Sequence, residues 1–130
     1  ESTVFGLINQ INEREADGRA RAARIVAMVL QFGEKNPGMT RVMVGDALVF
    51  EHERLQQRMN QLFDKLEATL RQCLREGAAV DGAALTPDAD AQLSASVLTA
   101  FMVGRLQRFA RSGFRRAPTE RLEACLARML

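Results

Sequence analysis

The stretch "AARIVAMVLQFGEKNPGMTRV", residues 22–42, contains the corner around which the fold is predicted to turn. Its first half is almost wholly apolar, which predicts a buried helix over Arg19–Phe32. Gly33 is expected to end that helix. Pro37 disfavours helical geometry at Asn36, and Gly38 permits a left-handed residue. The corner therefore follows from backbone chemistry, and it lacks the spacing of a phosphate-binding or dinucleotide-binding loop.

Apolar residues recur at helical spacing over most of the remaining chain. A first helix, "STVFGLINQINERE", is expected to end at residues 16–18 and to continue from protein upstream. Later helices are expected over Thr40–Phe50, Glu51–Arg75 with Gly77 as its stop, Asp88–Arg111, and Thr119–Leu130. Thr86 and Thr119 are the expected caps. The sequence thus predicts an all-α fold of about six helices, in a single domain over residues 1–130.

The composition, 47% hydrophobic and 26% charged over 130 residues, is that of an ordinary globular domain. The longest apolar run, residues 25–30, is too short to span a membrane, and no signal-peptide pattern opens the chain. Cys73 and Cys125 are far apart on helical patterns, so we expect free structural thiols in a reducing compartment, the cytoplasm.

The residues that enzymes and metal sites require are sparse. His52 is the only histidine, and Glu51, His52 and Glu53 point in three directions on a helix. We therefore expect no catalytic activity, no metal ion and no cofactor.

Positive charge is concentrated late in the chain, although the net charge is only +2. The segment "RLQRFARSGFRR" contains Arg105, Arg108, Arg111, Arg115 and Arg116. We interpret it as a solvated helix end, where cations complement the helix dipole. A phosphate-binding patch is the alternative.

The last two predicted helices have more apolar surface than one layer of a bundle needs, which indicates a homodimer. Small residues repeat every four positions on one face and would let two helices approach closely. The expected interface residues are Ser96, Leu98, Ala100, Phe101, Met102, Gly104, Leu122 and Leu126.

Residues 32–76 resemble the C-terminal domain of the SlmA-type nucleoid occlusion factors of the TetR-like family. The blocks F-G-E-[KR]-N-P-G, G-x-A-L-x-F-E and R-L-Q-x-R-[MI]-N-Q-L-F carry the resemblance, which weakens after Gly77 and returns in residues 104–120. It implies a helical regulatory domain that dimerises and follows a helix-turn-helix module. These residues contain no helix-turn-helix pattern, so DNA sequence would be read only by that upstream module.

The resemblance also implies a partner, the C-terminal tail of the tubulin-like division protein FtsZ, and a location at the nucleoid. Binding would block assembly of the division ring over the chromosome. The implied tail-binding residues are Leu7, Met28, Gln31, Lys35 and Asn36. Two of them depart from the family pattern, which has Arg at the position of Leu7 and Gly at that of Gln31.

A ligand-sensing domain of a TetR-like transcriptional repressor is the alternative function, because fold alone does not separate the two. The predicted interior offers few polar groups to orient a ligand, which favours the division inhibitor. A filled bundle would support that choice, and a large enclosed cavity would support the sensor.

Overall fold

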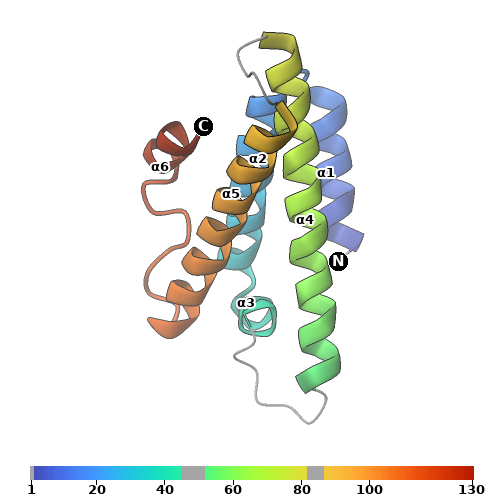
Figure 1. The fold of residues 1–130 in the computed structure, drawn as a ribbon. Helices are drawn as coiled ribbons and strands as arrows, with labels where there is room; N and C mark the ends of the chain where they lie inside the picture. Colours follow the sequence, from blue (N-terminus) through green and yellow to red (C-terminus); the bar gives the residue numbers. More distant parts are fainter. Residues whose placement is uncertain (1, 45–51, 82–86) are drawn as a thin grey trace.

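The computed structural model describes residues 2–44, 52–81 and 87–130, and these residues form six α-helices and no strand. The helices are α1 (Ser2–Arg14), α2 (Gly18–Lys35), α3 (Pro37–Met43), α4 (His52–Asp81), α5 (Pro87–Arg111) and α6 (Leu122–Met129). The long helices form a bundle, α3 lies across one end of it, and α6 lies beside α5 (Figure 1). The predicted all-α class is confirmed.

Helix α2 occupies the middle of the bundle and contacts α1, α4 and α5. Ile25, Val26 and Leu30 are fully buried, as the apolar composition of this helix predicted. The most extensive packing is between α4 and α5. Their contribution to the core consists of Leu62, Leu66, Leu70, Cys73, Leu74, Ala91, Ala95, Leu98, Met102 and Leu106.

Gly33 does not end α2, contrary to the prediction, because the helix continues to Lys35. A Cβ atom at Gly33 would lie 2.5 Å from Leu106 Cδ2 and 3.0 Å from Thr40 Oγ1. The residue therefore provides close approach between α2, α3 and α5 rather than a left-handed backbone. Helix α3 begins at Pro37, a favoured first position, and not at Thr40. The later part of that expected helix, residues 45–50, lies outside the described residues.

Gly77 does not end α4 either, since the helix continues through it to Asp81. One glycine costs a helix about 1 kcal/mol relative to alanine, which a helix of 30 residues tolerates. The next helix, α5, begins at Pro87. The expected cap, Thr86, lies outside the described residues.

Helix α5 ends in a Schellman motif. The N–H of Phe114 donates to the carbonyl of Phe109 at 2.8 Å, and the N–H of Gly113 donates to that of Ala110 at 3.1 Å. Gly113 is left-handed, with φ 67°. The rings of Phe109 and Phe114 meet edge to face with centroids 5.2 Å apart, which supplies the apolar contact that usually accompanies this motif.

Thr119 does not cap the last helix, which begins at Leu122 behind a left-handed Arg121 with φ 52°. The Thr119 hydroxyl instead donates to Glu34 Oε1 at 2.7 Å. This bond ties the segment before α6 to the end of α2. The hydroxyl of Thr119 thus bonds a distant carboxylate and not the helix start that local propensity favours.

The two cysteines are free; Cys73 is buried in α4 and Cys125 is half-buried in α6. Within the described residues, no helix combines the length and apolarity that crossing a membrane requires.

Candidate partner-binding surfaces

The corner between α2 and α3 is held by hydrogen bonds that converge on one carbonyl. The Gly33 carbonyl accepts from the N–H of Asn36 at 3.2 Å and from the buried hydroxyl of Thr40 at 2.7 Å. The Asn36 side chain donates from Nδ2 to the Phe32 carbonyl at 2.8 Å. Its Oδ1 makes no hydrogen bond to a described residue, so the rigid corner presents this acceptor to a partner.

Three of the sequence-predicted site residues share one stripe of α2. Met28, Gln31 and Lys35 are spaced by three and four residues, which places them on the same helix face. Gln31 and Lys35 are exposed, as expected, whereas Met28 is half-buried and packs partly against the core. The stripe therefore combines an apolar base with a polar and cationic rim at the corner.

The fifth predicted residue, Leu7, lies on α1, which packs against α2 (Figure 1). Leu7 is 36% exposed. Sequence reasoning missed Met39, which is 42% exposed on α3, three residues beyond Asn36. Its exposure follows from its place in the first turn of α3, where Pro37 and Gly38 are exposed as well.

Three of the residues expected at the dimer surface are buried within one protomer. Leu98 and Met102 are 0% exposed inside one protomer and cannot contact another; Leu126 is also buried. Phe101 and Leu122 are half-buried. Ser96, Ala100 and Gly104 are exposed, as a dimer face requires, and the same face contains two exposed aliphatic side chains, Leu93 at 67% and Val97 at 53%.

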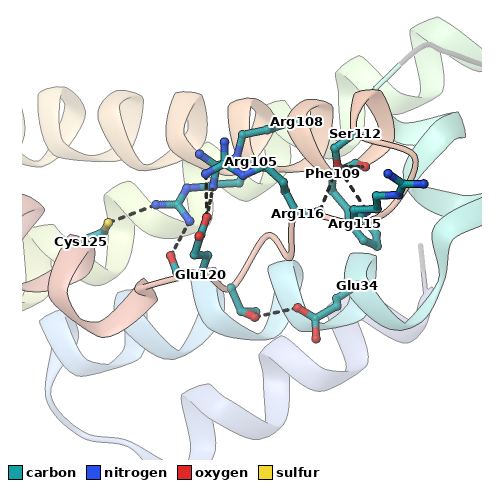
Figure 2. Close-up of polar contacts among 10 residues, drawn as sticks. Glu34, Arg105, Arg108, Phe109, Ser112, Arg115, Arg116, Glu120 and Cys125 are labelled. Atoms are coloured by element: carbon teal, nitrogen blue, oxygen red, sulfur yellow. Dashed lines mark hydrogen bonds and ion pairs between the residues drawn. The ribbon is translucent and has the colours of Figure 1, made fainter.

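A cluster of arginines surrounds Glu120 beside α5 (Figure 2). Arg108 and Arg116 contact the Glu120 carboxylate at 3.0 and 2.9 Å. Arg105 donates to the Glu120 carbonyl and to Cys125 Sγ, and its guanidinium lies 4.7 Å from the centre of the Phe101 ring. The hydrogen bond from Arg116, reinforced by the nearby guanidinium charges, lowers the pKa of Glu120 below its ordinary value.

A polar pocket of about 380 Å³ opens at the surface between α1, α2 and α4. Its charged groups, Arg21 and Glu76, already form an ion pair with each other. The hydrogen bond from Gln72 and that ion pair lower the pKa of Glu76. The core of the described residues beneath it consists of apolar side chains.

No group of three or more His, Cys, Asp or Glu side chains in the described ranges could hold a metal ion. The surfaces described above offer exposed apolar side chains, guanidinium groups and hydrogen-bonding groups.

The described residues thus form an all-α bundle with an apolar outer face on α5 and a polar corner between α2 and α3. Residues 17–129 match the family described as tetracyclin repressor-like, C-terminal domain, in its SlmA-like branch, and the chain belongs to this family. That family is defined by a repressor-like domain and not by an enzyme, in agreement with the sequence analysis.

Relatives carry the same name across several bacteria. The chain is 48% identical over 124 residues to the nucleoid occlusion factor SlmA of Escherichia fergusonii, and 47% identical to those of Salmonella typhi and Klebsiella pneumoniae. Each match covers 95% of this chain. The chain spans only 62% of the length of these relatives.

Proposed function

We propose that this domain is the dimerising, partner-binding part of a nucleoid occlusion factor. It binds a second copy of itself and the C-terminal tail of FtsZ, and it thereby blocks assembly of the division ring over the chromosome. DNA sequence is read by an upstream module, which places the protein at the nucleoid in the cytoplasm. The observation that carries this proposal is the rigid, exposed corner next to the α2 stripe, in a chain nearly half identical to nucleoid occlusion factors.

The tail would bind along the stripe formed by Met28, Gln31 and Lys35, with Asn36 at one end and Leu7 at the side. Met28 supplies an adaptable apolar contact, Lys35 a positive charge, and Asn36 Oδ1 an acceptor for a peptide N–H. Binding by one domain should be weak, because a disordered tail loses conformational freedom when it docks. Several dimers on one DNA would strengthen capture through multivalency.

The test is a fluorescence anisotropy titration of a labelled FtsZ tail peptide with the parent, Lys35→Glu and Arg71→Glu. Both variants change the charge equally at exposed positions, but Arg71 lies on α4 and not at the corner. Lys35→Glu should weaken tail binding about tenfold, as expected for the loss of a favourable charged contact worth over 1 kcal/mol. Arg71→Glu should bind like the parent. Equal affinities for the parent and Lys35→Glu would remove the corner from the site.

The second copy would dock on the exposed face of α5, formed by Leu93, Ser96, Val97, Ala100 and Gly104, with α6 completing a four-helix interface. A two-fold interface uses the same face on both copies, so one substitution acts twice. Val97→Arg and Gly104→Leu should each yield monomers in sedimentation velocity at micromolar concentration. Gln57→Arg on α4 should leave the dimer intact. A monomeric parent chain would contradict this part of the proposal.

A further inference from the structure

The charge of this chain is strongly segregated. Residues 105–121 contain six arginines and a single carboxylate, Glu120, whereas the whole chain has a net charge of only +2. The remaining residues are therefore net negative. We call residues 111–121, which connect α5 to α6, the basic turn.

The helix dipole explains only part of this charge. Arg108 and Arg111 lie in the last turn of α5, where cations are favourable. Arg115, Arg116 and Arg121 follow the helix. The terminal carbonyls of Phe109 and Ala110 already accept hydrogen bonds from the backbone of the Schellman motif. The positive charges of Arg115, Arg116 and Arg121 are therefore not needed to end the helix.

The backbone of the basic turn is held in place. The Ser112 hydroxyl accepts from the N–H groups of Arg115 and Arg116 at 3.3 and 3.0 Å and donates to the Phe109 carbonyl. Pro118 is fully buried, and Thr119 is tied to Glu34. Figure 2 shows the Arg115 guanidinium directed away from the cluster around Glu120. The turn is therefore a rigid support for outward-pointing arginines.

Three of these arginines have no internal role. Arg111, Arg115 and Arg121 are exposed, and their guanidinium groups contact no carboxylate within the described part of the chain. Glu120 is shared between Arg108 and Arg116, so it cannot neutralise the turn. A net positive charge on a rigid surface attracts a polyanion.

We propose that the basic turn binds the phosphate backbone of duplex DNA, independently of base sequence. Guanidinium forks match the geometry of phosphate oxygens. Single-stranded bases would need exposed aromatic rings for stacking, but Phe109 is buried and Phe114 packs edge-on against it. The relatives are named nucleoid occlusion factors. In a nucleoid, duplex DNA is the abundant polyanion. This contact goes beyond the proposed function, which assigns all DNA binding to an upstream module.

The test measures binding of this chain to a fluorescent duplex of random sequence over a series of salt concentrations. The variant is Arg111→Gln/Arg115→Gln, and the control is Arg58→Gln/Arg71→Gln, which removes the same charge from exposed positions on α4. Each phosphate contact contributes about 0.9 to the slope of log affinity against log salt. The slope should therefore become shallower by about 2 in the variant, with at least roughly tenfold weaker binding at low salt. The control should match the parent.

Three outcomes would overturn the proposal. The variant could bind DNA like the parent, or both double variants could lose affinity equally, which would indicate diffuse attraction. The variant could also lose binding to polyglutamate but not to DNA, which would assign the turn to an acidic protein. Arg115→Gln/Arg121→Gln tests the same turn independently if circular dichroism shows the first variant misfolded. Titration of the same variants with the FtsZ tail peptide tests the proposed function separately, because tail binding is assigned to the corner and not to the basic turn.

Discussion

Replacing Gly33 by alanine tests the packing that joins the corner to the rest of the bundle. The new Cβ would lie 2.5 Å from Leu106 Cδ2 and 3.0 Å from Thr40 Oγ1. Leu106 is fully buried, so its side chain has little room to rotate away. Overpacking of this kind costs about 1–3 kcal/mol, whereas alanine gains about 1 kcal/mol over glycine within a helix. The two effects leave a net destabilisation of about 1 kcal/mol.

The measurement is thermal unfolding at a fixed chain concentration, because self-association would make the midpoint depend on concentration. With an unfolding entropy of about 2.1 cal/mol/K per residue, 1 kcal/mol shifts Tm by about 4 °C in a chain of this length. Gly33→Ala should therefore lower Tm by about that amount. Gly6→Ala is the control, since Gly6 lies within α1 with no atom within 4 Å of the added Cβ. It should raise Tm by about 2–4 °C.

A double-mutant cycle identifies the clash itself. Leu106→Val removes the Cδ atoms, so Gly33→Ala should cost less in the Leu106→Val background than in the parent. If Gly33→Ala raises Tm as Gly6→Ala does, or if the cycle is additive, α2 and α5 do not approach as closely as described and the reasoning is refuted.

Three further predictions concern other contacts. Thr40→Val keeps the shape but removes the buried 2.7 Å bond to the Gly33 carbonyl, so chemical denaturation should report a loss of about 1 kcal/mol; an unchanged midpoint would contradict that bond. Because the pKa of Glu120 is lowered, with Arg116 as the main cause, its contribution to stability is present above the unfolded pKa and lost as pH falls through the folded value. The Tm of the parent should therefore fall more steeply below about pH 4.5 than that of Glu120→Gln, and parallel profiles would argue against the arginine cluster. A thiol reagent should modify half-exposed Cys125 in the native protein and buried Cys73 only after unfolding; mass spectrometry showing a bridge between them would overturn this.

Features of the backbone could be predicted from the sequence where neighbouring residues determine them. The corner at Asn36–Pro37 and the all-α class follow from residues within a few positions of each other. The predictions for Gly33 and Thr119 were wrong because the residues that they contact are distant in the sequence. Gly33 accommodates Leu106 on α5, and the Thr119 hydroxyl bonds a carboxylate 85 residues earlier. Local propensity is a weak guide where a tertiary contact competes with it.

The faces of α5 illustrate a second limit. Apolar residues occur on more than one side of this helix, so periodicity cannot say which side meets its own bundle. Leu98 and Met102 turned out to lie inside the protomer, whereas Leu93 and Val97 are exposed. The positions of the small residues were the better guide. Ser96, Ala100 and Gly104 are all exposed on the outer face.

The same distinction between bonded and exposed side chains applies at the corner. Glu34 and Lys35 are adjacent, but Glu34 is bonded to Thr119 and holds the basic turn against α2. Lys35 is exposed and has no carboxylate partner among the described residues. Substituting Glu34 would therefore loosen the basic turn, because that bond ties it to α2. Substituting Lys35 or Arg115 changes only exposed charge, so those two positions can separate the proposed tail binding from the proposed DNA binding.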